Sequence, residues 1–560
     1  MRIDVIDRDD DFDAVRANWD AVFLRDQHAQ HFLSWVWMRS YLKRRGRWFI
    51  LALRESEPGS AYVAFFPLRL VTYRDKLTGL FCDEIIMAGN YAADYTGFIA
   101  DPAYERQAIE GFSTYLHHQR WTHLKLDYFG GSPERQQAMV QAMRGPALMH
   151  RNSAIQNKEN IDNCICPVVS LPARWDDYLD THMSSQTRQK LRRFLRKIEG
   201  DEAYRIRFAT AETIKGDLDI LFALWRAKWL PQKGERRIDR LIASSREMLM
   251  DCFDDGNLEL PVLWHGQQPL GALANIVDRQ KKTVHFYMTG RDESWTTPSP
   301  GLVLHGYCIR RAIEAGFRYY DFLRGNEPYK YMFGPVERRI SCTLFQTRTG
   351  RNLGDKLNLR SIRHVYDRGR DFYRKGHKQA AEGAFQQVID AAPEHLGALF
   401  GLANISFEKG RIAEAEVLYR TVAAKTSDPV PVQIKVGDTQ LALRRYGEAA
   451  QTFSDIIERS PHNSEAHYKH GVALVAAKRL LEAAKAFRQL ETYHSDDAGH
   501  ALYRDKAAKA GARILNAVPA FSPAPRSDLQ LFAKDGPELA QKRSEQDLRS
   551  SVASPIRWLH

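Results

Sequence analysis

The chain has no stretch that would cross a membrane or direct export. Its first fifteen residues are acidic and lack an apolar core, so they do not resemble a signal peptide. The most apolar run, residues 61–71, is interrupted by Pro67 and Arg69 and is too short to span a bilayer. We therefore expect a cytoplasmic protein, with peripheral attachment at the inner membrane left open.

Cysteine is scarce, and its spacing excludes the common structural metal motifs. Cys164 and Cys166 form a CxC pair whose side chains would point to the same face of a strand. Thiols buried in the core are the favoured interpretation, and we expect no metal site. The six cysteines are Cys82, Cys164, Cys166, Cys252, Cys308 and Cys342.

Basic residues outnumber acidic ones, 81 against 69, which gives a net charge of +12. This excess suggests anionic partners, such as the phosphates of CoA, a phospholipid-linked sugar, RNA or a membrane surface. The charge by itself selects none of them. A length of 560 residues with 44% apolar residues predicts two to four domains with ordinary cores.

Two stretches of the chain share one order of predicted elements. Each has a strand, two helices, three strands in a meander, a helix and a further strand. In the first stretch these span residues 3–6, 11–24, 34–45, 48–54, 62–71, 82–87, 104–119 and 123–128. In the second they span residues 204–208, 212–230, 238–253, 258–264, 270–278, 283–288, 300–315 and 319–323, with a last strand at 340–347.

Residues 283–335 contain the highest density of candidate catalytic and binding residues. A strand, a polar loop, a helix with Ser299 as N-cap and Pro300 at its first position, and a buried strand predict a parallel crossover. Ligands of such units lie at the carboxyl ends of the strands, near the helix N-terminus. Five polar side chains follow in that place: Asp321, Arg324, Glu327, Tyr329 and Lys330.

The Ser-Pro-Gly helix start at Ser299 and the segment DFLRGNEPYK at 321–330 resemble GNAT-fold acyltransferases of the cellulose-biosynthesis (CelD/BcsL-like) kind, relatives of the FemAB-like peptidyltransferases. The resemblance covers residues 1–350 and implies an α/β (α+β) fold of two GNAT-like lobes with mixed sheets, 1–170 and 171–350. The matching stretch of the first lobe, LKLDYFGGSPE, has Asp127 but no lysine after it, so we expect the second lobe to be catalytic and the first to be structural and acceptor-binding.

The same resemblance implies transfer of an acyl group from an acyl-CoA co-substrate, most simply acetyl-CoA, with no permanently bound cofactor. The implied acceptor is an amino sugar or a lipid-linked saccharide of exopolysaccharide or cell-envelope synthesis. The strand at 283–288 would hydrogen-bond the pantetheine arm and polarise the thioester carbonyl.

One imidazole and one carboxyl group are candidates for proton transfer. His285 has a pKa range suited to a general base, although a strand histidine is more often structural. Asp321 lies in an apolar run where an unpaired carboxylate is costly. It therefore either pairs with Arg324 or Lys330 or stands at the strand end as base or acceptor ligand.

The loop after Asp321 supplies the remaining catalytic candidates. Tyr329 could protonate the leaving thiolate, and Lys330 could stabilise an oxyanion or bind a phosphate. The alternative is that Glu327 and Lys330 form only an ion pair in a surface loop. Candidate CoA-binding residues are Tyr287, Ser299, Gly301, Leu302 and Arg324.

The helix start departs from the glycine-rich pyrophosphate loop of GNAT enzymes, because TPSPGLVLHG has the single early glycine Gly301. A helix N-terminus with one glycine still holds an anion, but less specifically. The CoA donor therefore rests on the resemblance, and an aminoacyl-tRNA donor, as in FemAB-like enzymes, stays open.

An amphipathic helix is predicted between the lobes at residues 184–199. One face is apolar, and the other carries Arg188, Arg192 and Arg196. This basic face is either solvated surface or a cradle for a phosphate-bearing donor or acceptor.

From residue 362 the sequence becomes a repeat with a period of 34 residues. Small and aromatic positions recur together, and the array over 362–515 resembles tetratricopeptide (TPR) repeats, which implies a peptide or protein partner on its concave face. The recurring residues are Ala381, Ala415, Ala449 and Ala483, Phe385, Tyr419, Phe453 and Phe487, and Gly369, Ala403, Gly437 and Gly471. Residues 518–560 are polar with scattered prolines and predict a disordered tail.

Two further functions remain as alternatives. The first is a FemAB-like transfer from aminoacyl-tRNA, which would require tRNA as a partner. The second is a catalytically silent scaffold centred on the TPR array. A nucleic-acid-binding regulator is the least favoured function, and we expect no DNA partner, because the basic residues are spread over the chain and no base-reading motif occurs in the sequence.

Overall fold

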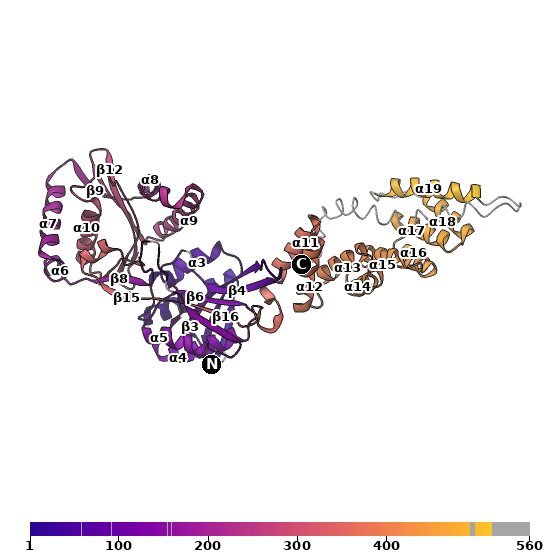
Figure 1. The fold of residues 1–560 in the computed structure, drawn as a ribbon, viewed down its shortest axis with the longest axis horizontal. Helices are drawn as coiled ribbons and strands as arrows, with labels where there is room; N and C mark the ends of the chain where they lie inside the picture. The colour runs from indigo at the N-terminus through magenta and orange to yellow at the C-terminus, as the bar shows by residue number, and fades with distance from the viewer. Residues whose placement is uncertain (58, 91, 154, 158, 493–498, 518–560) are drawn as a thin grey trace. The chain divides into compact units, whose positions relative to one another are not determined.

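The computed structural model describes residues 1–57, 59–90, 92–153, 155–157, 159–492 and 499–517, drawn in colour in Figure 1. The chain divides into two compact units. The first contains Met1–Val71 and Asp83–Asp355, and the second contains Thr72–Cys82 and the chain from Lys356 onward. The predicted disordered tail, 518–560, lies outside the described residues.

The first unit contains two sheets of eight strands. The first sheet has the order β1-β2-β3-β4-β6-β16-β7, with β5 (Ile99–Ala100) paired to β3. Its strands are β1 (Arg2–Ile6), β2 (Trp48–Arg54), β3 (Tyr62–Arg74), β4 (Phe81–Met87), β6 (His123–Phe129), β7 (Leu148–Asn152) and β16 (Ser341–Thr347). β4 and β6 are parallel.

The second sheet has the order β15-β8-β14-β13-β12-β11-β9, with β10 (Leu258–Glu259) paired to β12. Its strands are β8 (Ile165–Ser170), β9 (Tyr204–Phe208), β11 (Pro261–His265), β12 (Gln268–Asp278), β13 (Thr283–Arg291), β14 (Tyr319–Asp321) and β15 (Val336–Arg339). The crossover predicted from residues 283–323 is confirmed, since β13 and β14 are parallel.

Helices cover both faces of each sheet. α4 (Glu105–His117) and α5 (Pro133–Ala142) pack on one face of the first sheet, and α1 (Asp9–Ala14), α2 (Arg16–Arg25) and α3 (Trp35–Lys43) pack on the other. α6 (Trp175–His182), α7 (Ser185–Gly200) and α10 (Pro300–Glu314) cover one face of the second sheet. α8 (Ile214–Lys233) and α9 (Glu235–Asp254) cover the other and share one apolar core with α3, so the two sheets have a common interior.

The two lobes exchange strands. β8 precedes residue 171 but joins the second sheet, and β16 joins the first sheet between β6 and β7. The prediction that 340–347 is the last strand of the second lobe is therefore wrong. The boundaries 1–170 and 171–350 cut through this exchange and stay predictions as domain limits. The predicted helix 11–24 is two helices, α1 and α2, which meet at Val15.

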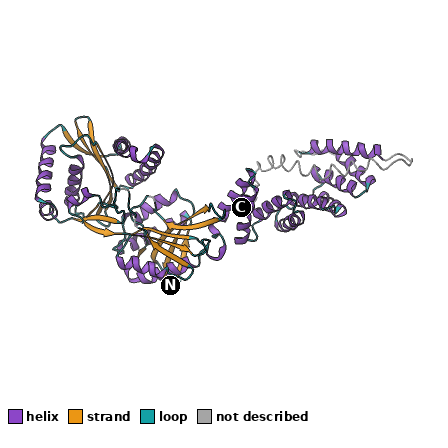
Figure 2. Cartoon of the chain, in the orientation of Figure 1, coloured by secondary structure: helices purple, strands orange, loops and turns teal. Residues whose placement is uncertain are grey.

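From Lys356 onward the described residues form helices and loops without strands (Figure 2). The helices are α11 (Ile362–Arg374), α12 (Lys378–Ala391), α13 (Leu396–Glu408), α14 (Ile412–Lys425), α15 (Val430–Ala442), α16 (Tyr446–Arg459), α17 (Ser464–Ala476), α18 (Leu480–Thr492) and α19 (His500–Ala517). A Cβ added to Gly437 would overlap the ring of Phe453, and one on Gly471 would overlap Phe487. The predicted fold class is thus confirmed: two mixed sheets with helices precede a helical repeat.

Candidate active site

The backbone of β13 loses one of its neighbours halfway along its length. Its parallel pairing with β14 extends only from Thr283↔Tyr319 to His285↔Asp321, where β14 ends. β13 continues to Arg291. Its pairing with β12 shifts at Tyr287, which is the extra residue of a β-bulge. Within the part of the chain that the structure describes, peptide groups on this edge beyond His285 have no ladder partner from β14 and can bond a ligand.

Asp321 stands where the two strands separate, and it is 1% exposed. Its carboxylate accepts hydrogen bonds from the hydroxyl of Tyr95 at 2.8 and 3.0 Å and from the backbone N–H of Leu323 at 2.8 Å. The Nδ1 atom of His285 lies 3.6 Å from Oδ2 of Asp321. The predicted pairing of Asp321 with Arg324 or Lys330 is wrong, because Tyr95 of the first lobe takes that place.

The imidazole of His285 is completely buried, and neither ring nitrogen has a hydrogen-bond partner among the described residues. It lies among rings, with centroids of His31, Phe32 and Tyr95 at 6.5, 5.9 and 6.4 Å. A buried polar group without a partner is costly and is a frequent mark of a functional site. A small movement toward Asp321 would orient one nitrogen and leave the other as a proton acceptor.

Burial sets the protonation states around this pair. It lowers the pKa of His31 and of His305 to about 3, so both imidazoles are neutral at physiological pH. It raises the pKa of Tyr95, Tyr287 and Tyr329 far above the usual range, so these phenols keep their protons. The hydroxyl of Tyr287 donates to the carbonyl of Ala92 at 3.2 Å.

Tyr329 is the most accessible of the predicted catalytic residues, with 38% of its surface exposed. It belongs to the 3-10 helix η3 (Pro328–Phe333), and its ring lies 6.2 Å from that of His305. His305 itself contacts Phe286 of β13 at 4.5 Å between centroids. Tyr329 is therefore linked by one intervening ring to the strand that would hold the thioester.

Hydrogen bonds and ion pairs of Arg324 and Lys330 fix the loop between these two residues. Nε of Arg324 donates to Asp94 at 2.6 Å, and its guanidinium lies 3.8 Å from the ring centroid of Tyr128. Nζ of Lys330 is within 2.9 Å of the carbonyls of Arg324 and Gly325 and of a carboxylate oxygen of Glu327. The ammonium has three donors, so none is left for an oxyanion. The alternative Glu327–Lys330 ion pair is present, but Lys330 is buried.

The start of α10 is the candidate place for the CoA phosphates. Ser299 occupies the N-cap position without a side-chain capping bond, and Pro300 is the first helical residue. A Cβ added to Gly301 would lie 3.6 Å from Nη1 of Arg291, which also pairs with Glu293 at 2.8 Å. Arg291 brings a cation to a helix N-terminus, which favours an anion. Leu302 packs into the core beneath.

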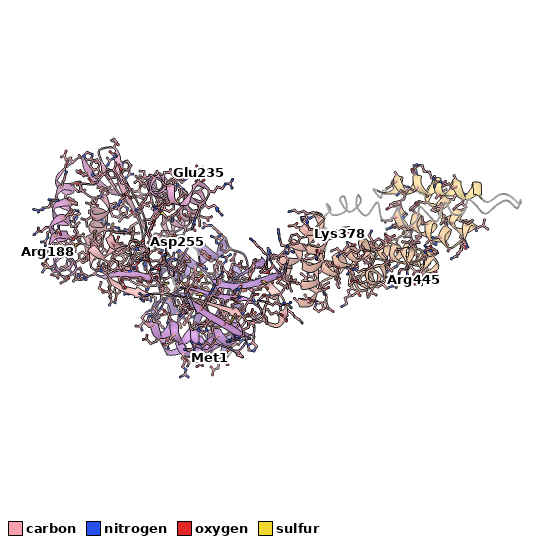
Figure 3. All side chains as sticks on the ribbon, in the orientation of Figure 1. Met1, Arg188, Glu235, Asp255, Lys378 and Arg445 are labelled. Carbon is pink, nitrogen blue, oxygen red and sulfur yellow. The ribbon has the colours of Figure 1, made fainter. Side chains whose placement is uncertain are left out.

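The arginines of α7 are not part of this site. The apolar face of α7 packs inward, with Leu191 against Gly306 of α10. Arg188 pairs with Asp180 at 2.7 Å and Arg192 with Asp176 at 3.2 Å, both on α6. Figure 3 labels Arg188 at the outer edge of the molecule's first unit. The solvated-surface interpretation accounts for Arg188, Arg192 and Arg196, all on the opposite face from the core.

A small cleft of about 30 Å³ lies between α3 and α9. Trp37 and Tyr41 line it from α3, with stacked rings 5.2 Å apart, and Asp251 lines it from α9. His31 and Ala92 also line it; the ring of His31 lies 6.5 Å from that of His285, and the carbonyl of Ala92 accepts from Tyr287. The remaining lining includes Arg44, Glu247 and Asp255.

Sequence reasoning missed Tyr95, Asp94, His31 and Arg291. The first three lie in the first lobe and reach the site from 190 or more positions away, so no local pattern marks them. Arg291 alone had a signal, because it follows the predicted strand that ends at the same loop. No group of three or more His, Cys, Asp or Glu suited to a metal ion occurs in the described part of the chain.

Comparison with known proteins agrees with this geometry. Residues 185–331 match the family model of the acetyltransferase (GNAT) domain, and residues 366–429 and 436–500 match the tetratricopeptide repeat. The chain therefore carries a GNAT-type acyltransferase domain followed by TPR repeats, and it is an enzyme of the acyltransferase class. Among the described residues, no helix has both the length and the apolarity that a membrane crossing needs.

Individual proteins are similar only in part. A protein CTR9 homolog of Arabidopsis thaliana is 26% identical over 156 residues, which are 28% of this chain and 14% of that protein. The structure of FemX is similar over 61% of this chain and 97% of its own, with 10% identity and a TM-score of 0.42. A structure of MamA is similar over 32% of this chain and 98% of its own, with 19% identity and a TM-score of 0.23.

Proposed function

We propose that the protein transfers an acyl group, most simply acetyl, from CoA to the amino group of a saccharide. The acceptor would be an amino sugar or a lipid-linked saccharide of exopolysaccharide or cell-envelope synthesis, and the reaction would take place in the cytoplasm. The observation that carries the proposal is the separation of β13 from β14 with Asp321 and His285 at the point of separation.

The donor would bind along β13. Peptide N–H groups beyond the bulge at Tyr287 would hydrogen-bond the pantetheine arm and the thioester carbonyl, as an added strand does. The pyrophosphate would lie at the start of α10 beside Gly301, where Arg291 would exchange its bidentate partner Glu293 for the phosphates. This arrangement directs the thioester carbon toward the buried pair.

The proton transfers then assign roles to three side chains. The acceptor amine attacks the thioester carbon and passes a proton to His285, which Asp321 orients. The new C–N bond forms, the C–S bond breaks, and the phenolic O–H of Tyr329, which keeps its proton, hydrogen-bonds to the thiolate. The proton held by His285 passes through solvent to the thiolate, so the products are the amide and CoA. Lys330 and Glu327 fix the loop that carries Tyr329.

Calorimetric titration with acetyl-CoA and desulfo-CoA, followed by thiol release in the presence of amino sugars, tests the proposal. We expect micromolar binding by the wild type and by Asp321→Asn, with thiol release reduced more than about 100-fold in the variant. Asp4→Asn is the matched control, because Asp4 also accepts from a tyrosine, Tyr62 at 3.2 Å, far from the site. Absence of binding to any CoA species would refute the CoA donor.

A transfer from aminoacyl-tRNA is the second candidate. The observation that favours it is the single glycine at the start of α10, because a CoA donor is usually bound by a glycine-rich pyrophosphate loop. It requires RNA binding that weakens steeply with salt. We also propose that the TPR array binds a protein or peptide partner. A catalytically silent scaffold would be indicated if Asp321→Asn left the cellular phenotype intact and removal of 362–515 abolished it.

A further inference from the structure

The turn between α8 and α9 carries a surface that the active site does not use. The two helices form an antiparallel hairpin joined by Gly234, whose φ of +73° places it in the left-handed region. The base of the hairpin is anchored in the core by Leu218, Leu221 and Leu249. We define the hairpin tip as residues 225–241; Figure 3 labels Glu235 on it.

The hairpin tip exposes large apolar side chains. Leu230 is 37% exposed and Leu241 is 38% exposed. Trp225 and Trp229 are half-buried, with ring centroids 6.5 Å apart. Single exposed leucines are common, but two exposed leucines and two half-buried tryptophans within the hairpin tip are the kind of apolar surface that marks an interaction site.

Basic side chains surround this apolar patch. The ammonium groups of Lys228 and Lys233 lie 5.4 and 4.5 Å from the ring centroid of Trp229. Arg236, Arg237 and Arg240 are exposed, and none has a carboxylate partner in the part of the chain that the structure describes. The two acidic residues of the hairpin tip, Glu235 and Asp239, both pair with Arg226.

We propose that the hairpin tip docks on an anionic lipid surface. Its unpaired arginines would meet the headgroup phosphates, while Trp229, Leu230 and Leu241 would enter the boundary between headgroups and acyl chains. The exposed leucines favour a lipid surface over a nucleic acid, because binding to nucleic-acid phosphates needs only the basic side chains and gives the leucines no role. The inference does not depend on the chemistry at Asp321, although it would bring the enzyme to a lipid-linked acceptor.

Sedimentation with vesicles tests this docking on the full-length protein. We expect binding to vesicles of equal parts phosphatidylcholine and phosphatidylglycerol and no binding to pure phosphatidylcholine. The triple variant Arg236→Gln, Arg237→Gln, Arg240→Gln should reduce partitioning roughly 100-fold, since each basic side chain near the surface contributes about fivefold. Wild-type protein that ignores anionic vesicles, or a triple variant that binds as well as wild type, would overturn the proposal.

Two control variants distinguish lipid binding by the hairpin tip from nonspecific attraction by the net charge and from RNA binding. Lys190→Gln, Arg193→Gln, Lys197→Gln makes the same charge change on three exposed positions of α7 and should change partitioning less than about threefold; an equal loss would contradict a specific patch.

Leu230→Ser, Leu241→Ser keeps the charge and should weaken vesicle binding roughly tenfold by removing inserted apolar surface. If this leucine variant binds vesicles normally while RNA competes with them, the surface is a nucleic-acid site and the lipid proposal fails. Acetyl-CoA titration of each variant reports on the active site separately.

Discussion

Replacing Tyr95 by phenylalanine removes one oxygen and tests whether the first lobe supports the reaction. The phenolic hydroxyl lies 2.8 and 3.0 Å from the two carboxylate oxygens of Asp321, across the junction of the lobes. The ring, which packs 6.3 Å from Phe32, stays in place. After the change, the N–H of Leu323 is the one close donor that Asp321 keeps among the described residues.

The size of the effect of Tyr95→Phe follows from the negative charge of the Asp321 carboxylate, which accepts the lost hydrogen bond. A hydrogen bond to a carboxylate contributes about 1.5–3 kcal/mol. If this whole free energy is lost from the transition state, kcat/KM falls about 10- to 100-fold. Because the site is buried, the same loss lowers the free energy of unfolding by about 1–3 kcal/mol. Acetyl transfer and urea unfolding would be measured on the same preparations.

The control and the double variant separate positioning from stability. Tyr62→Phe removes a hydroxyl that donates to Asp4 at 3.2 Å and should cost stability without loss of activity. Tyr95→Phe combined with Asp321→Asn should be no slower than Asp321→Asn alone, since the two groups act as one unit. Additive rate losses, or wild-type activity in Tyr95→Phe, would refute the reasoning.

Acid should destabilise the first unit, because burial lowers the pKa of His31 and His305 to about 3 while the unfolded chain takes up protons below about pH 6.5. Stability is full above that pH and falls by about 2 kcal/mol per histidine at pH 5, and His305→Leu should halve the loss in urea titrations followed by tryptophan fluorescence. Gly290→Val should displace β13, since a Cβ there would lie 2.5 Å from the carbonyl of Leu221, and should abolish acetyl-CoA binding in calorimetry. Gly437→Leu should unfold part of the repeat by colliding with Phe453, seen as lost helix in circular dichroism, with acetyl-CoA binding unchanged.

Local pattern predicted the elements that carry the site. β2 and β9 begin and end at the residues that alternation and turn residues indicate, and the crossover from β13 through α10 to β14 follows from N-cap and apolar periodicity. The 34-residue period defined the repeat because each small residue must face an aromatic ring, as Gly471 faces Phe487.

Pairing between distant segments was beyond such patterns. β8 is a short apolar run that contains Pro167, and β7 is largely polar, so neither shows the alternation of a half-buried strand. β16 has a clear strand pattern, but nothing in it says which sheet supplies its neighbours. The strand exchange is decided by tertiary contacts alone.

The candidate site, like the fold, was predictable from local sequence only in part. The apolar surroundings of Asp321 predicted that it needs a partner, but Tyr95 lies 226 positions away and no spacing points to it. The charges of Lys330 and Arg324 suggested ligand binding, whereas both are consumed by neighbouring carbonyls and carboxylates. Residue type thus predicted the kind of chemistry, and only packing decided which groups are available for it.

A structure of the protein with a non-hydrolysable acyl-CoA analogue is the most direct test of the central claim. The account predicts that the acyl carbonyl lies within hydrogen-bond distance of a β13 peptide N–H at or beyond Tyr287, with the pyrophosphate at the start of α10 beside Arg291. An analogue bound elsewhere, with β13 and β14 free of ligand, would contradict it.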